Sequence, residues 1–360
     1  RGSGCLASSF LRYLTATSER GAPPPPMLLR ALLLGAAAAA AVRLPTPVEP
    51  RQPDLSVIHV AYVADPGAFT GLLSSMLSLS RSLKRPQDCR IHLIVAEEDA
   101  SQAKSLSECF RRELEGLEAI PVVEVHGMRA EAMPFDASKR AGDPHLNHVK
   151  APFFRFYIAD LLPAVDRVLY LDTDTIVRTD VGPLYRMPMR HSIAIRHERA
   201  SMEKLLQAVH MNSSNLMRYM PDKTLPILQD GVVMMDLRKW RSEGIARALE
   251  EWPAKLGTYS DQILISLEYN YRREHDILDE AWNLYGMGLR NWFERLVTAT
   301  PDWTPVQLAE ARIFHFSGSG KPWTNATSKD GKASKPSKFQ DLYTPYAPHL
   351  HCEALGGQRL

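Results

Sequence analysis

The chain has 360 residues, of which 45% are hydrophobic, which is enough for one large or two modest globular domains. Its formal net charge is +2, so no strong overall field draws it toward nucleic acid. Composition therefore excludes a strongly basic nucleic-acid-binding protein and leaves enzymes and binding modules open.

Residues 1–50 differ in composition from the rest of the chain. An apolar, alanine-rich run from Ala31 to Val42 follows Met27, which we take as the natural start, and prolines come after it. This pattern resembles a secretory signal peptide or a short signal anchor through residues 28–42, because the run is too short for an ordinary spanning helix. We therefore expect a leader and linker in residues 1–50 and a place in the secretory pathway, in the Golgi lumen. A disordered alanine- and proline-rich leader is the alternative.

The four cysteines show no spacing typical of a metal site. In an oxidising lumen Cys89 and Cys109 could form a disulfide, and two buried free thiols are the alternative. Glycosylation sequons at Asn212 and Asn325 fit a secretory route.

From Val57 onward, strand and helix patterns alternate along the chain. This alternation predicts a parallel sheet with helices on both faces. Ligands bind beyond the carboxyl ends of the strands in such sheets, and Asp65 and Asp172 stand at two such ends. The expected strands cover 57–65, 90–98 and 119–126, and the expected helices 69–83 and 99–114.

The second half of the chain follows a looser pattern. Residues 126–149 and 197–228 predict long loops, and loops of this length are often functional. We expect a helix over 151–163, strands over 167–171 and from 231, helices through Trp252 and over 259–270, and a last strand from 311 that breaks into a glycine-rich loop. Residues 51–350 would form a single domain, and residues 324–360 a partly flexible tail.

The segment "YLDTDTIV" places Asp172 and Asp174 directly after a buried strand. Haloacid-dehalogenase-like phosphatases carry this pattern with Thr175 included, and use the first aspartate as nucleophile. Those enzymes place the motif on their first strand and need a late acidic pair. Here a long α/β segment precedes the motif, and Asp276 with Asp279 is the nearest pair, so the phosphatase is a weak alternative.

A transferase that holds a metal and a diphosphate explains more of the chain. A divalent cation on hard carboxylate oxygens neutralises a departing diphosphate, and Asp172 and Asp174 can both reach one ion. The segment "HFSGSGKPW" offers His315 as a third ligand, which suits manganese. In the same loop, Gly318 and Lys321 form a candidate phosphate clamp.

Three segments in this order, "LDTD", "GVVMMDLRKW" and "HFSGSGKPW", resemble retaining glycosyltransferase family 8. That family includes glycogenin, bacterial lipopolysaccharide galactosyltransferases and plant galacturonosyltransferase-like proteins. The resemblance covers residues 57 to about 325 and implies an α/β fold of the GT-A nucleotide-diphospho-sugar transferase type, with a Rossmann-like, mostly parallel sheet. It also implies transfer of a hexosyl or uronosyl unit from a UDP-sugar, with retention, to a saccharide, glycoprotein or glycolipid acceptor.

The resemblance assigns roles to the positions that match the family motifs. Gly318 and Lys321 would contact the diphosphate, and Ala64 and Asp65 the uracil and ribose. The remaining assignments are manganese or magnesium at Asp172, Asp174 and His315, the donor phosphate and sugar at Arg155, the anomeric carbon at Asp261 and Gln262, and a further recurring pair at Trp282 and Asn283.

The chain departs from the family pattern near the donor sugar, where Gln229 and Asp230 replace the usual residues. Because the amide of Gln262 is a poor nucleophile, we expect same-face attack by the acceptor hydroxyl, with Asp261 or Asp230 as the alternative nucleophile. A sugar-binding or scaffolding protein of the same fold is the second functional hypothesis.

Structural roles are the alternative for three of these residues. Asp65 and Asp261 could each cap a helix, and Arg155 could pair with Asp160 on its own helix.

Overall fold

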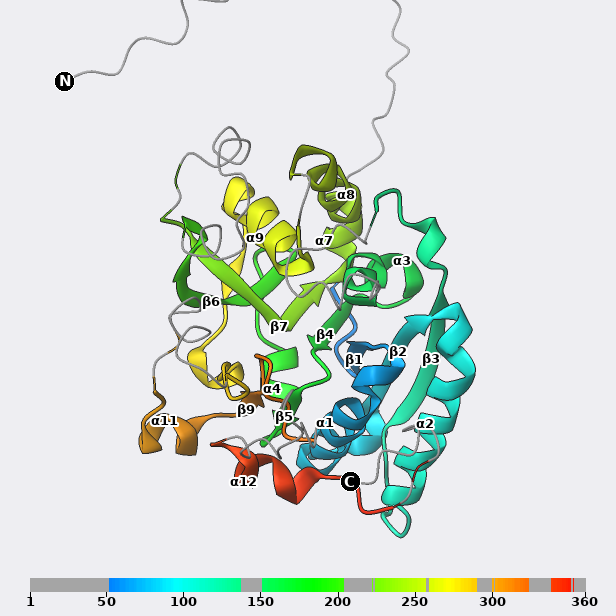
Figure 1. Ribbon diagram of the computed structural model, residues 1–360. Helices are drawn as coiled ribbons and strands as arrows, with labels where there is room; N and C mark the ends of the chain where they lie inside the picture. Colours follow the sequence, from blue (N-terminus) through cyan, green and yellow to red (C-terminus); the bar gives the residue numbers. More distant parts are fainter. Residues whose placement is uncertain are drawn as a thin grey trace, which may run out of the picture. The chain divides into compact units, whose positions relative to one another are not determined.

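A seven-stranded sheet with the order β3-β2-β1-β4-β7-β6-β8 organises the fold (Figure 1). The computed structural model describes residues 52–136, 151–203, 222, 224–256, 259–289, 300, 302–323, 338–350 and 352. The strands of this sheet are β1 (Ile58–Val63), β2 (Cys89–Ala96), β3 (Val122–Met128), β4 (Arg167–Leu171), β6 (Ile193–Ser201), β7 (Pro226–Asp236) and β8 (Asp276–Ile277).

Strand direction divides the sheet into two parts. Strands β3, β2, β1 and β4 are parallel to one another, as the alternating pattern predicts. Strand β7 runs antiparallel to both β4 and β6, and β8 is parallel to β6. The sheet is therefore mixed and mostly parallel. A second sheet pairs β5 (Thr175–Val177) with β9 (Ile313–His315) in antiparallel fashion.

Helices cover both faces of the large sheet, and this explains why every residue of the central strand β4 is buried. On β4, Leu169 and Leu171 face a core with α1 (Phe69–Ser82) and α2 (Ala100–Glu113). Val168 and Tyr170 face the opposite core. The helices of that second core are α3 (Ile158–Leu161), α7 (Leu237–Ser242), α8 (Ile245–Leu256) and α9 (Asp261–Arg272).

Shorter elements complete the described fold. They are α4 (Gly182–Tyr185), α11 (Pro305–Glu310) and α12 (Gln340–Tyr343), with the 3-10 turns η2 (Pro66–Ala68), η3 (Pro86–Asp88), η4 (Glu97–Asp99), η5 (Ala130–Ala132), η8 (Ala151–Tyr157), η9 (Glu280–Trp282) and η10 (Thr344–Tyr346).

Three predictions of secondary structure were wrong in detail. The single helix expected over 151–163 is the 3-10 segment η8 followed by the four-residue α3, and it ends before Pro163. The region expected to be irregular contains β6, whose pattern was hidden because the buried strand carries the charged residues Arg196 and Glu198. Strand β7 also begins at Pro226, five positions before the expected start.

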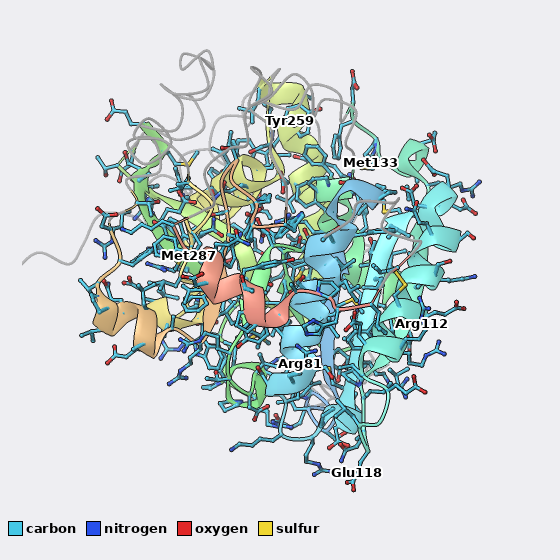
Figure 2. All side chains as sticks on the ribbon, turned by 60° about the horizontal axis from the view of Figure 1, so that its bottom comes forward. Arg81, Arg112, Glu118, Met133, Tyr259 and Met287 are labelled. Carbon is cyan, nitrogen blue, oxygen red and sulfur yellow. A yellow bond between two sulfur atoms is a disulfide. The ribbon has the colours of Figure 1, made fainter. Side chains whose placement is uncertain are left out.

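The disulfide joins Cys109 on α2 to Cys352, across 243 positions of the sequence (Figure 2). A bridge between Cys89 and Cys109 is therefore wrong, and Cys89 is a buried free thiol. Of the expected tail, the described part forms α12 and η10, and Tyr343 lies 2.6 Å from Ser74 on α1 through their hydroxyl oxygens. The described residues after 338 thus pack against α1.

No helix in the described part of the chain combines the length and apolar character that a membrane span requires. The expected leader, the segment 28–42 and both sequons lie outside the described residues. The same holds for most of the loops expected at 126–149 and 197–228.

Candidate active site

A cavity of about 610 Å³ opens at the carboxyl ends of β1 and β4, a size typical of ligand sites. Its walls bring together residues that are far apart in the sequence. The sequence-predicted residues that line it are Ala64, Asp65, Arg155, Asp172, Asp174, Gln229, Asp230, Asp261, Gln262, His315, Gly318 and Lys321. Trp282 and Asn283 are not among the lining residues, although Asn283 contacts two of them, His315 and Gln229.

Strand ends explain how most of these side chains reach the cavity. Asp65 follows β1, and its carboxylate accepts a hydrogen bond from Gly67 N at 2.9 Å, so it also caps η2. Asp172 follows β4, and its backbone N–H donates to Gly231 O on β7 at 2.8 Å. Parallel strands thus deliver two carboxylates to one edge of the sheet.

Asp172, Asp174 and His315 form a compact cluster whose candidate ligand atoms lie within 4.8 Å of one another. His315 Nε2 is 3.1 Å from Asp174 Oδ1 and 3.7 Å from Asp172 Oδ2. Oδ1 of Asp174 is buried and accepts no hydrogen bond from any residue of the described ranges. The cluster therefore contains a buried carboxylate oxygen that lacks a donor.

The neighbours of His315 fix which ring nitrogen faces the carboxylates. His315 Nδ1 lies 3.1 Å from Asn283 Oδ1, an acceptor, while Asn283 Nδ2 donates to Gln229. In the neutral imidazole the proton is thus on Nδ1, and Nε2 directs a lone pair at Asp174. The lone pairs of His315 Nε2 and Asp174 Oδ1 would repel each other, and a cation bound by both atoms removes this repulsion. These ligands therefore fit a divalent metal.

Gly231 makes room for the His315 ring beneath β7. A Cβ atom built on Gly231 would lie 2.1 Å from His315 Cε1, closer than any allowed contact. The glycine after Gln229 and Asp230 is therefore required by the close approach of the imidazole.

Lys321 lies at the end of the glycine-rich loop and contacts Asp174 Oδ2, and its Nζ also donates to Phe316 O at 3.0 Å. Gly318 allows this loop to turn, because its φ of 113° is left-handed. Burial raises the pKa of Asp174, but the charge of Lys321 lowers it overall. Asp174 is thus ionised under all physiological conditions.

Arg155 connects the cluster of Asp172, Asp174 and His315 to the opposite wall of the cavity. Its guanidinium lies 3.1 Å from Asp172 Oδ1, 2.7 Å from Asp230 Oδ2 and 3.1 Å from Asp261 Oδ2. It also stacks over the Tyr170 ring at 4.6 Å, and Tyr170 donates to Asp172 Oδ1 at 2.6 Å. The pairing of Arg155 with Asp160 is therefore wrong, and Ser260 rather than Asp261 caps α9.

The charges around Arg155 do not balance, since three carboxylates face one guanidinium. Burial lowers the pKa of Arg155, but the carboxylates of Asp230, Asp261 and Asp172 raise it well above its ordinary value. Burial raises the pKa of Asp230, and Asp261 and Asp172 reinforce this against the ion pair with Arg155. This end of the cavity is accordingly acidic.

Glu198 on β6 was missed by the sequence analysis. Its Oε1 accepts hydrogen bonds from Gln262 Nε2 at 2.9 Å and from Gln229 Nε2 at 3.2 Å, so it orients both amides that line the cavity. Burial raises its pKa to about 7. The signal in the sequence was the spacing of Arg196 and Glu198, which stand two positions apart and therefore lie on one face of a strand.

The late acidic pair of the phosphatase hypothesis lies elsewhere. Asp276 on β8 accepts hydrogen bonds from the backbone N–H groups of Arg190 and His191 at 2.8 and 3.0 Å. Asp279 caps η9. Neither residue lines the cavity, so neither could assist Asp172 as the second acidic pair of a phosphatase.

The mixed sheet with a cavity beyond β1 and β4 defines the class as an α/β transferase of the GT-A type. The galactosyltransferase LgtC, solved with donor and acceptor sugar analogs, superposes with a TM-score of 0.58 at 16% identity and covers 84% of this chain and 100% of that chain. The apo form of mouse xyloside xylosyltransferase 1 gives a TM-score of 0.50 at 16% identity, over 73% of this chain and 98% of that one. These similarities establish the fold.

The family follows from the sequence itself. The model of glycosyl transferase family 8 matches residues 60–327. Probable galacturonosyltransferase-like 10 of Arabidopsis thaliana is 26% identical over 310 residues, which are 82% of this chain and 78% of that protein. The chain belongs to glycosyl transferase family 8 and is a glycosyltransferase, as the resemblance implied, and the phosphatase hypothesis is wrong.

Proposed function

We propose that this glycosyltransferase moves a hexosyl or uronosyl unit from a UDP-sugar to a saccharide, glycoprotein or glycolipid, with retention and with a divalent metal. The observation that carries the proposal is the cavity that joins Asp172, Asp174 and His315 to Arg155 and Lys321. A galactosyltransferase and a galacturonosyltransferase-like protein among the similar proteins support a sugar of this class.

Asp172, Asp174 and His315 would hold manganese or magnesium. The lone pair of His315 Nε2 that faces the donor-free Oδ1 of Asp174, 3.1 Å away, supports this assignment. Asn283 and Gly231 keep the imidazole in place from the far side. When bound, such an ion neutralises the charge that develops on a diphosphate leaving group.

Lys321 and Gly318 would bind the diphosphate of the donor. Lys321 contacts Asp174 in this structure, so its charge lies at the edge of the metal-type cluster, within reach of an anion in the cavity. Ala64 and Asp65 line the cavity beyond β1, a position suited to the uracil and ribose.

Arg155, Asp261 and Gln262 would surround the sugar. Asp230 and Asp261 both form ion pairs with Arg155, an arrangement that lowers the nucleophilicity of their carboxylates. The amide of Gln262 is neutral and is held by Glu198. These contacts favour attack by the acceptor hydroxyl on the face that the diphosphate leaves, over a covalent intermediate on Asp230 or Asp261.

We also propose that the protein works in the secretory pathway, in the Golgi lumen. The disulfide between Cys109 and Cys352 supports an oxidising compartment, and the leader pattern of residues 1–50 supports the same route.

UDP release from a panel of UDP-sugars, with and without manganese, tests the function. Asp174→Ala removes the carboxylate that contacts both His315 and Lys321, so we expect turnover to fall at least about a hundredfold, a loss typical of removing one electrostatic catalytic group. Asp341→Ala on the exposed part of α12 is the matched control and retains wild-type turnover. Equal turnover in Asp174→Ala and the wild type contradicts the metal assignment.

Calorimetry with UDP distinguishes an enzyme from a scaffold of the same fold. We expect manganese to strengthen UDP binding in the wild type and to have little effect in Asp174→Ala. The absence of UDP binding to the wild type, with or without manganese, would favour the scaffold.

A further inference from the structure

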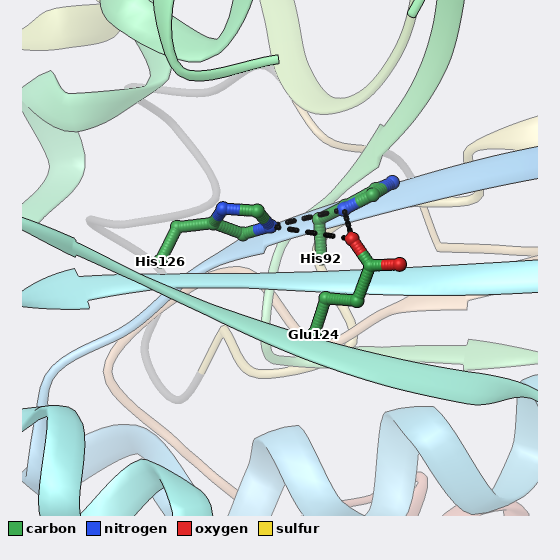
Figure 3. A group of neighbouring side chains, drawn as sticks. All are labelled: His92, Glu124 and His126. Carbon is green, nitrogen blue, oxygen red and sulfur yellow. Dashed lines mark hydrogen bonds and ion pairs between the residues drawn. The ribbon is translucent and has the colours of Figure 1, made fainter. Parts of the chain in front are cut away.

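A second group of residues that could bind a metal lies on the neighbouring strands β2 and β3, away from the candidate active site. His92 on β2 and Glu124 and His126 on β3 direct their side chains toward one point (Figure 3). None of the three lines the cavity described above. Their convergence is a separate feature of the parallel half of the sheet.

The strand register brings these three side chains together. His92 and Glu124 are direct partners in the β2–β3 pair. Glu124 and His126 are two residues apart on one strand, and residues at this spacing share a face. Cross-strand neighbours and their diagonals are close enough to interact, so the fold itself holds the three ligands in place.

The distances match those expected around one tetrahedral ion. His92 Nδ1 lies 3.1 Å from His126 Nε2 and 3.5 Å from Glu124 Oε2. His126 Nε2 and Glu124 Oε2 are 4.0 Å apart. With bonds of about 2.0–2.1 Å to nitrogen and oxygen, adjacent ligands of tetrahedral zinc are about 3.3 Å apart. A small inward movement of Glu124 completes this geometry.

Neighbouring side chains orient these ligands, as the hydrogen-bond partners of metal ligands do. His59 Nδ1 lies 2.9 Å from His92 Nε2. When His59 accepts that proton, the Nδ1 lone pair of His92 faces the cluster. Arg90 donates to Glu124 Oε1 at 2.8 Å and leaves Oε2 for an ion.

We propose that His92, Glu124 and His126 bind one divalent transition-metal ion of the zinc class, with water at the fourth position. Two imidazoles and one carboxylate are ligands that zinc prefers. The side chain of His92 is 2% exposed, but those of His126 and Glu124 are 23% and 39% exposed, so an ion can enter from solvent. The ion cross-links β3, at the edge of the sheet, to β2.

Zinc titration by calorimetry, with zinc chloride as the only ligand, tests this proposal. His126→Asn is expected to lose one equivalent of bound zinc relative to the wild type, and Glu124→Gln to weaken that equivalent at least tenfold. His349→Asn, which changes an exposed histidine after η10, keeps it. Asp174→Ala should also keep this equivalent of zinc, because Asp174 belongs to the other cluster. The zinc measurement therefore stays valid even if the proposed function is wrong.

Thermal unfolding gives a second measurement that does not depend on activity. At a zinc concentration about a hundred times the dissociation constant, we expect the melting temperature of the wild type to rise by about 5 °C. The rise should disappear in His126→Asn, and Glu124→Gln covers the case in which that variant does not fold. Equal zinc uptake by the wild type and both variants, or loss of all zinc in Asp174→Ala alone, overturns the proposal.

Discussion

Glu198 is a buried side chain that orients two of the amides lining the candidate active site. Its carboxyl group accepts from Gln262 and Gln229, and burial raises its pKa from 4.5 to about 7. The unfolded chain ionises this group above pH 4.5, whereas the folded chain keeps the proton until about pH 7. The contribution of Glu198 to the free energy of unfolding is therefore full below pH 4.5 and lost by pH 7, by about 3 kcal/mol.

Urea unfolding of Glu198→Gln at pH 5 and pH 8 measures this effect. The variant does not titrate, so its free energy of unfolding should improve relative to the wild type as the pH rises, by about 2–3 kcal/mol. Glu310→Gln, on the exposed end of α11, is the control. Its free energy of unfolding should differ from that of the wild type by the same amount at pH 5 and pH 8. If the difference in free energy of unfolding between Glu198→Gln and the wild type is the same at both pH values, Glu198 is already ionised in the folded protein at pH 5.

At the scale of elements, β7 and α9 bring two carboxylates to the same guanidinium. Asp230 on β7 and Asp261 at the start of α9 join Asp172 around Arg155. The cations among the described lining residues are Arg155 and Lys321, and both contact carboxylates. A uronate group on the donor sugar would add an anion to this acidic end, and like charges a few ångströms apart repel each other by several tenths of a kcal/mol to a few kcal/mol.

Within the proposed function, we therefore expect the enzyme to use neutral hexosyl donors with a higher kcat/KM than uronosyl donors. We expect kcat/KM for UDP-glucose or UDP-galactose to be at least tenfold above that for UDP-galacturonate, since about 1.4 kcal/mol gives this ratio. Asp261→Asn should narrow the ratio by removing one of the carboxylates beside Arg155. A higher kcat/KM for UDP-galacturonate in the wild type would refute the argument from charge.

At the scale of the whole molecule, the disulfide closes a loop that contains every strand after β2. Cys109 and Cys352 are separated by 243 positions, and a cross-link over a long loop limits the unfolded chain most. We expect Cys352→Ser to lower the free energy of unfolding by about 2–4 kcal/mol. Chemical denaturation of the wild type and the variant measures the difference.

Reduction provides the control for the disulfide. Dithiothreitol should destabilise the wild type to the level of Cys352→Ser and leave that variant unchanged, because Cys89 is a free thiol in both. Equal stability of the oxidised and reduced wild type would show that the packing of α12 against α1 holds this segment without the bond.

Much of the candidate site could be predicted from the sequence because its residues lie in short local motifs. Asp172 with Asp174, His315 with Lys321, and Asp261 with Gln262 each come from one segment that ends or begins an element. Glu198 could not be found this way, because its partners on β7 and α9 are distant in the sequence. The correct disulfide was missed for the same reason, since Cys352 gives no local signal.

The sequence by itself determined the strand–helix alternation, the motifs and the family, because periodicity and motif spacing are local properties of the chain. Only the tertiary structure decided which groups meet: Asp230 and Asp261 at Arg155, Glu198 at two glutamines, and His92 beside Glu124 and His126. Those contacts depend on strand register and on the antiparallel entry of β7. Both are set by packing on the two faces of the sheet, which connects parts of the chain that local patterns cannot relate.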